Sequence, residues 1–204
     1  MTTVELITAG KDIALAGAAI VTATVAIKGL NTWARQLRGT ADFETARAMA
    51  KVTYKLRDEI RNSRSMLIRA GEFPDGYSNL NSSKDSATEA SAYAHVFNQR
   101  WQPVYAALQE FDAQTLESEA IWGASIRMKT DELRRATRKL NAAMEAFVDN
   151  KASGGESFKQ DQDFRKKIHS EVFASPQDDK NALTVEINAA IQAIEDVIRP
   201  HLKR

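Results

Sequence analysis

Apolar side chains recur three and four residues apart over long stretches of the chain, which is the spacing of a helix with one packed face. The pattern is clearest in a segment that extends to about Ala70. No stretch alternates apolar and polar residues as a strand does. We therefore predict an all-α protein, an N-terminal single transmembrane helix followed by an antiparallel helical bundle of four to five helices. The clearest seam consists of Ala46, Met49, Thr53, Leu56, Ile60, Ser63 and Leu67.

Glycine and proline residues indicate where these helices end. Gly39 and the Thr-Ala-Asp run after it predict a helix end and a new cap. If that break is mild, the two segments instead form one long, stalk-like helix. The run from Pro74 to Gly76 predicts a turn, and the polar stretch 77–85 predicts a loop.

A second helix of the bundle is predicted to start at a capping box formed by Ser86 and Glu89. Its seam, if continued, reaches Thr115 and Ser118, where apolar residues are expected. We therefore predict a turn near residues 112–116, or else a corner at Pro103, the only proline of this stretch. The seam itself consists of Tyr93, Phe97, Val104, Leu108 and Phe111.

The remaining helices are predicted from their breaks and seams. The Ser-Gly-Gly run at 153–155 ends the third bundle helix, and a shorter helix follows. Ser175 and Pro176 suit the cap and first turn of the last helix, which stops near Pro200. The three seams consist of Trp122, Ile126, Leu133, Leu140 and Phe147; of Phe158, Phe164, Ile168 and Val172; and of Leu183, Ile187, Ala190, Ile194 and Ile198.

The N-terminal segment is apolar enough to suggest a membrane span. Fifteen uncharged residues lie between Asp12 and Lys28. A bilayer needs about 20 residues, with a lower limit of about 17, so the span requires Lys11 and Lys28 to extend toward the two interfaces. Trp33 would then lie at an interfacial depth. We divide the chain accordingly into residues 1–38, with the short tail and this helix, and residues 41–204, the bundle.

Three alternatives to a span are open. A cleaved signal peptide would need a cationic start, yet Glu5 and Asp12 flank Lys11, the first cation, although Thr24-Val25-Ala26 resembles a cleavage site. A helix buried in the core of a soluble protein has a similar composition. An amphipathic surface helix is disfavoured, because the apolar run has no polar face.

Charge on either side of the run predicts its orientation. Lys11 is the only cation before the run, whereas residues 28–70 carry ten Lys and Arg against four Asp and Glu. Positive flanks stay in the cytoplasm, so the short tail is predicted outside and the bundle in the cytoplasm. Anionic membrane lipid is the expected partner of the basic juxtamembrane residues. These residues are Lys28, Arg35, Arg38, Arg47 and Lys51.

Small side chains recur at every fourth position of the apolar run. This spacing stacks them on one helix face, which lets two helices approach closely in lipid. The predicted transmembrane packing face consists of Gly10, Ala14, Ala18, Thr22 and Ala26.

Catalytic chemistry has no recognisable signature in this sequence. The absence of cysteine excludes thiolate nucleophiles and disulfides. None of the three histidines has an acidic residue three positions away, as a di-iron bundle requires. No glycine spacing fits a phosphate-binding loop or a serine-hydrolase elbow. Only three residues separate Arg165 from His169, whereas helical ribonucleases have four to six. We predict no enzyme activity, no metal and no cofactor.

The sequence therefore favours a membrane-tethered, all-helical interaction module that acts by protein–protein binding or self-association. One alternative is an oligomeric effector that perturbs the membrane through its small-residue face. The other is a soluble helical protein with the N-terminal helix buried in its core. We do not expect a nucleic-acid partner, because Phe43 and Tyr54 are the only aromatic residues in the basic segment 41–70.

Overall fold

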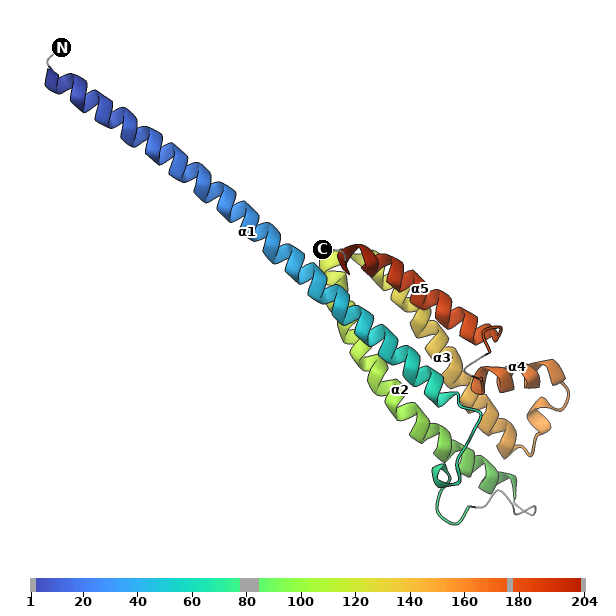
Figure 1. Cartoon of the computed structure of the whole chain (residues 1–204). Helices are drawn as coiled ribbons and strands as arrows, with labels where there is room; N and C mark the ends of the chain where they lie inside the picture. Colours follow the sequence, from blue (N-terminus) through green and yellow to red (C-terminus); the bar gives the residue numbers. More distant parts are fainter. Residues whose placement is uncertain (1–2, 78–84, 176–177, 203–204) are drawn as a thin grey trace. The chain divides into compact units, whose positions relative to one another are not determined.

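The computed structural model describes residues 3–77, 85–175 and 178–202, with side chains described at Lys11 and from Leu15 onward. Within these residues the protein is all-helical, as predicted, and contains no strand (Figure 1). The helices are α1 (Thr3–Ser63), α2 (Ser86–Trp122), α3 (Ala124–Ala152), α4 (Gln162–Val172) and α5 (Ala182–Leu202), with the 3₁₀ helices η1 (Ala70–Glu72) and η2 (Glu156–Phe158).

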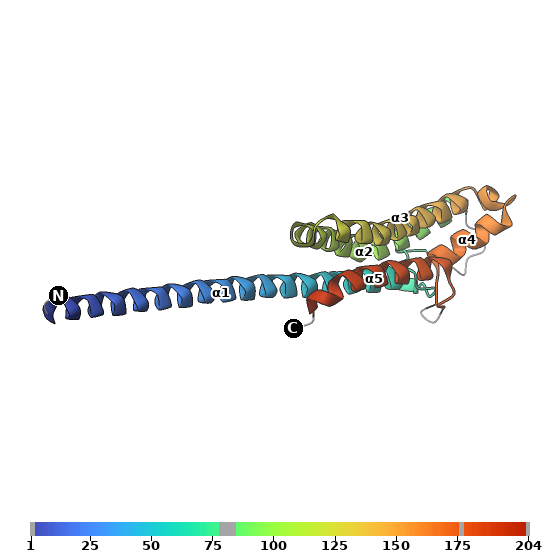
Figure 2. The same ribbon diagram turned by 90° about the horizontal axis from the view of Figure 1, so that it is seen from above.

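The chain divides into two compact units, Met1–Glu44 and Thr45–Arg204, and α1 is continuous through the division. In the second unit, α2 and α3 lie side by side, and α3 also packs against α4 and α5 (Figure 2). Contacts between helices indicate their register: Lys55 of α1 pairs with Glu110 of α2, and Lys139 of α3 pairs with Glu186 of α5. The turn between α2 and α3 thus lies at the same end of this unit as Thr45.

The seam predicted for the basic segment is confirmed from Ala46 to Ser63, where every member is buried. Leu67 is instead 68% exposed, because α1 ends at Ser63 and not near Ala70. The Ser63 hydroxyl donates to the Ile60 carbonyl at this end of the helix.

The predicted break at Gly39 is wrong. α1 passes through this glycine and spans 61 residues without interruption, which is the stalk-like alternative. A glycine in a helix interior costs only about 1 kcal/mol relative to alanine, which the residues on either side can offset.

The predicted turn at residues 112–116 is also wrong, and Pro103 lies inside α2. Thr115 and Ser118 continue the buried seam, although they are polar. Each hydroxyl donates 2.8 Å to the carbonyl four residues earlier, so neither is left without a hydrogen bond in the core. The turn occurs at Gly123, whose φ of 77° favours glycine.

Two helix starts differ from prediction because other side chains cap them. Asp85, not Ser86, precedes α2 and accepts a 2.6 Å hydrogen bond from the Thr88 amide. α5 begins at Ala182, where Asn181 accepts from the Thr184 amide, and not at Ser175. Pro176 and residues 78–84 of the predicted loop lie outside the described residues.

Other predicted breaks are confirmed. Tyr77 donates its amide to the Pro74 carbonyl at 3.0 Å, which closes the predicted turn. α3 ends at Ala152, and Gly154 and Gly155 follow with positive φ angles. α5 runs to Leu202, two residues past the expected stop at Pro200.

A buried arginine joins the end of α1 to α4 and α5. Arg64 is only 3% exposed, and burial lowers the pKa of its guanidinium. The guanidinium donates to four oxygen atoms at 2.8–3.1 Å, and its own carbonyl accepts from the Ala174 amide at 3.0 Å. The four acceptors are the carbonyls of Ser170 and Glu171, the side-chain amide of Asn181 and the hydroxyl of Thr184.

Arg64→Met is expected to destabilise the protein by about 3 kcal/mol, because it leaves buried acceptors without a donor. The control is Arg61→Met, since Arg61 is exposed and its side chain pairs with no described residue; we expect a change under about 0.5 kcal/mol. Urea unfolding curves of the two variants measure the difference. Equal curves would show that the Arg64 network does not hold the end of α1.

Candidate functional site

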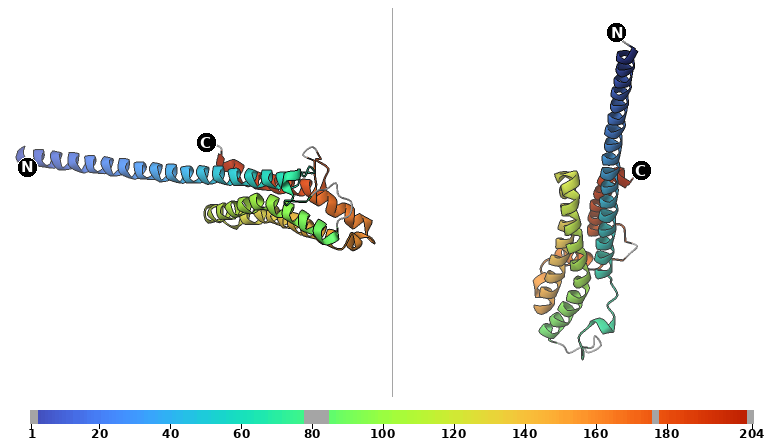
Figure 3. Two further views of the ribbon diagram at one scale, coloured as in Figure 1. Left: turned by 90° about the horizontal axis from the view of Figure 1, so that it is seen from below. Right: turned by 90° about the vertical axis from the view of Figure 1, so that its left-hand side faces the viewer.

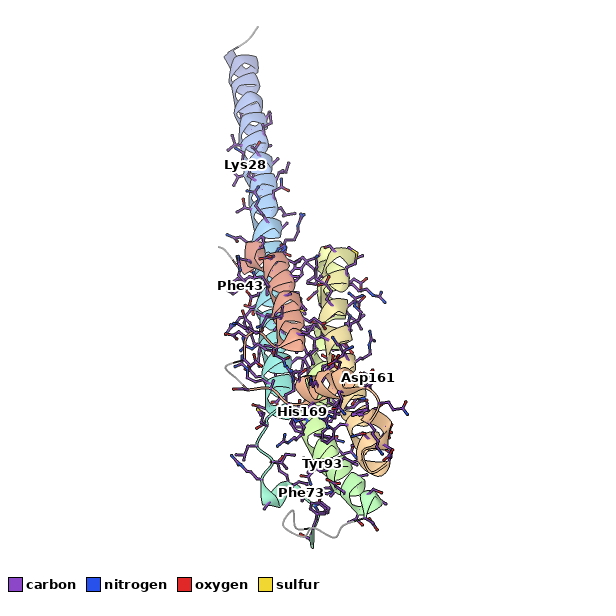
Figure 4. All side chains as sticks on the ribbon, turned by 90° about the vertical axis from the view of Figure 1, so that its right-hand side faces the viewer. Lys28, Phe43, Phe73, Tyr93, Asp161 and His169 are labelled. Atoms are coloured by element: carbon purple, nitrogen blue, oxygen red, sulfur yellow. The ribbon has the colours of Figure 1, made fainter. Side chains whose placement is uncertain are left out.

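The first candidate region is the apolar stretch of α1. Six of its large apolar side chains are 57–69% exposed, and Trp33, which follows them, is 62% exposed. By length and composition α1 is able to cross a membrane. Figure 4 shows side chains around Lys28 projecting from all sides of the helix. The six are Leu15, Ile20, Val21, Val25, Ile27 and Leu30.

Threonine hydroxyls within this stretch are satisfied by their own helix. Thr22 donates to the Ala18 carbonyl and Thr24 to the Ile20 carbonyl, each at 2.8 Å, and Thr32 donates to the Lys28 carbonyl at 2.9 Å. A polar group in hydrocarbon is costly unless it is hydrogen-bonded. These threonines therefore do not prevent the helix from lying in lipid.

The small residues of the predicted packing face are partly described. Ala18, Thr22 and Ala26 are exposed on α1, four residues apart. Gly10 and Ala14 belong to the same helix, but their surroundings lie outside the described side chains. Whether this face packs against a second helix stays a prediction.

The predicted juxtamembrane basic residues are all exposed. Lys28, Arg35 and Arg38 belong to the first unit, whereas Arg47 and Lys51 lie on α1 in the second unit, off the buried seam. None forms an ion pair with a residue that the structure describes, so their charges are available to an external anion.

The second candidate region is a groove of about 680 Å³ that the sequence did not predict. It is lined from α2, α3, η2, α4 and the segment that follows α1. Figure 4 shows Tyr93 and His169 toward the end of the bundle that carries α4. The described lining residues are Met66, Ile68, Tyr93, Phe147, Asn150, Lys151, Phe158, Arg165, Lys166, His169 and Phe173.

One wall of the groove is aromatic. The ring of Phe147 meets those of Tyr93 and Phe173 edge to face, with centroids 5.4 Å apart in both pairs. The imidazole of His169 lies 5.1 Å from the ring of Phe173. Edge-to-face packing fixes ring orientations, so the wall keeps a defined shape.

Cations lie beside the aromatic wall and at the rim of the groove. Lys151 pairs with Glu89 at 2.7 Å, and its ammonium lies over the rings of Tyr93 and Phe147, 5.0 and 5.7 Å from their centroids. Lys166 is exposed and lies 3.7 Å from Asp163, whereas Arg165 has no ion-pair partner among the described residues. No carboxylate is among the described lining residues, so the groove favours an anion.

A second arginine holds the segment that supplies Met66 and Ile68. Arg100 donates to the carbonyls of Ser65 and Leu67 at 2.7 Å, and also pairs with Glu72. This hydrogen bond from Arg100 is the main reason that the pKa of Glu72 is lowered. The backbone beside the groove is thus fixed by a paired, largely buried guanidinium.

Among the described residues, no cluster of histidine and carboxylate side chains suits a metal ion. The sequence signal that came nearest to the groove was the short basic string that contains Arg165 and His169. It gave no hint of the aromatic wall, because Tyr93 and Phe147 come from α2 and α3.

Glu72→Gln is expected to destabilise the protein by about 1 kcal/mol near neutral pH. The native pKa of Glu72 lies below the unfolded value of about 4.3, so its stabilisation is present above that value and is lost as the pH falls through the native pKa. The stability gap between wild type and variant should therefore narrow as the pH falls below the unfolded pKa. Urea unfolding at several pH values measures this gap.

The control is Glu117→Gln, since Glu117 is exposed on α2 and its side chain pairs with no described residue. A gap for Glu72→Gln that stays constant with pH would contradict the assigned pairing with Arg100.

Comparison with known proteins finds no matching family model, no matching curated protein and no matching solved structure. The function of both regions is therefore inferred from the residues of this chain alone.

Proposed function

We propose that the chain is a single-pass, membrane-tethered helical module that acts by binding another protein or a second copy of itself. The observation that carries the proposal is the exposed apolar stretch of α1 with its internally bonded threonine hydroxyls. Transfer of such a stretch from water to lipid is favourable, since each large apolar side chain contributes about 1.5–3 kcal/mol on burial. A tether would raise the effective concentration of the bundle near a membrane partner.

The flanking charges support a cytoplasmic bundle. Lys28, Arg35 and Arg38 are exposed and unpaired among the described residues, as anionic headgroups require. Trp33 comes between them and suits the interface between lipid and water. In this orientation the residues before Lys11 lie on the opposite side.

The end of the second unit that carries Thr45 also exposes apolar side chains. Leu116, Ile121 and Met128 lie on either side of Gly123 and are 46–66% exposed. Figure 3 shows the turn between α2 and α3 together with the C-terminal end of α5 at this end of the bundle. Exposed apolar side chains near one turn are candidates for contact with another protein. They support binding as the activity of the module.

Val21→Asp combined with Val25→Asp is expected to abolish stable membrane association of the full chain. Both side chains are more than 60% exposed, so the fold should tolerate the change, whereas each aspartate costs about 2.5–3.5 kcal/mol at the centre of a membrane helix. Alkaline carbonate extraction is the measurement: wild type stays in the pellet and the variant is released. The control is Val185→Asp at a 50% exposed position of α5, which should stay in the pellet.

Release of the wild-type chain by carbonate would overturn the tether and leave the soluble alternative. The same membranes test orientation, because the chain has no native cysteine. A cysteine introduced by Asp163→Cys should resist an impermeant maleimide added from outside until the membrane is opened. Labelling in intact cells would reverse the proposed topology.

Ala18→Leu combined with Ala26→Leu tests self-association through the small-residue face. The larger side chains prevent close approach of two helices, so association should weaken by about tenfold or more. Cross-linking in membranes and the mass in detergent are the measurements. The control is Ile20→Leu combined with Ile27→Leu, which conserves volume on the opposite helix face. Equal association of both variants would exclude this face, and a monomeric wild type would leave a different protein as the partner.

The membrane-perturbing alternative is tested with the same variants in a growth assay. Overexpression of wild type would then stop growth, and the Ala18 and Ala26 substitutions would restore it. Normal growth with the wild-type chain in the membrane favours the tethered module.

A further inference from the structure

The groove between α3 and α4 combines an aromatic wall with exposed cations. Its aromatic wall offers ring contacts to a flat group beside the Lys151 ammonium, while its rim carries exposed cations. Its volume of about 680 Å³ lies in the range of about 300–1,000 Å³ that small-molecule sites occupy. We infer that the groove binds a small aromatic anion, with the ring against Tyr93, Phe147 and Phe173 and the phosphate or carboxylate at Arg165 and Lys166.

The cations on α4 that line the groove form no strong ion pair with a described residue. Glu89 neutralises Lys151, which leaves the outer cations on α4. Asp163 lies 3.7 Å from Lys166, but both side chains are at least 75% exposed, so this pair contributes little. Arg165 meets no carboxylate among the described residues and offers the forked donor geometry that fits phosphate and carboxylate groups.

The aromatic wall is the part of the proposed site that contacts the ring of the ligand. Phe147 contacts Tyr93 and Phe173 edge to face, so the wall is held before a ligand arrives. A planar ring gains stacking or edge contacts there without ordering flexible side chains. An anion without a ring would use only the rim, and a neutral ring would use only the wall.

The groove lies at one end of the second unit. It opens near the end of α1 in the second unit, whereas Thr45 lies at the other end. Residues 45–63 of α1 separate these ends by about 28 Å at 1.5 Å per residue. The inference does not depend on the tether.

Isothermal titration calorimetry of the full chain in lipid nanodiscs tests the inference. The probes are adenosine 5′-monophosphate and phenyl phosphate as aromatic anions, adenosine as a neutral ring and inorganic phosphate as an anion without a ring. At least one aromatic anion should bind at one site, at least about tenfold more tightly than adenosine or phosphate. The inference fails if neither aromatic anion saturates the protein by about 10 mM, or if adenosine or phosphate binds equally well.

Matched variants locate the site. Arg165→Gln combined with Lys166→Gln should weaken binding of the aromatic anion by about tenfold or more. Lys167→Gln is the control, because Lys167 is exposed on the same helix but does not line the groove, and it should bind like wild type. Phe173→Leu should weaken aromatic anions and leave phosphate unchanged, with the helix content checked by circular dichroism. Equal losses in the Lys167 variant would overturn the assignment and indicate attraction by net charge alone.

Failure of this inference and failure of the tether are distinguishable. If carbonate releases the wild-type chain, the same titration is run without lipid, and the groove should bind as before. If the chain stays in the membrane but no probe binds, only the groove assignment is lost.

Discussion

The exposed apolar stretch of α1 is the physical constraint on which the interpretation of this protein depends. Six large side chains between Leu15 and Leu30 are each more than half exposed. At about 1.5–3 kcal/mol for each burial, covering them is worth roughly as much as the whole stability of an ordinary domain. Lipid or a second apolar helix would supply that cover, and the threonine hydroxyls on this stretch are already bonded within α1.

Much of the fold was predictable because helical seams are local patterns. The seam from Ala46 to Ser63 is buried as expected, and the glycines after Ala152 end α3 as expected. One error arose where polar side chains formed hydrogen bonds that residue type alone does not reveal. Thr115 and Ser118 look like a loop by polarity, yet hydroxyl bonds to preceding carbonyls let them fill the core.

The sequence predicted the first candidate region but not the second. The apolar stretch and its basic flank are continuous in the sequence, so a run of residue types was enough to propose them. The groove unites side chains from α2, α3 and α4 that lie up to 80 positions apart, such as Tyr93 and Phe173. Such a meeting depends on the register of the packed helices, which is set by the turn at Gly123, a turn that the pattern misplaced at residues 112–116.

Buried arginines explain why the groove keeps its shape although one wall is not helical. The segment after Ser63 has few backbone partners of its own. Arg64, at its start, donates to Glu171 and Asn181, and Arg100 donates to two carbonyls within the segment. Arg64 ties the end of α1 to α4 and α5, while Arg100 holds the carbonyls of Ser65 and Leu67 from α2. A wall fixed by protein hydrogen bonds loses little freedom when a ligand arrives, so more of the contact energy remains as affinity. The hydrogen bonds of Arg64 and Arg100 therefore both stabilise the bundle and keep the groove in a shape that suits a small ligand.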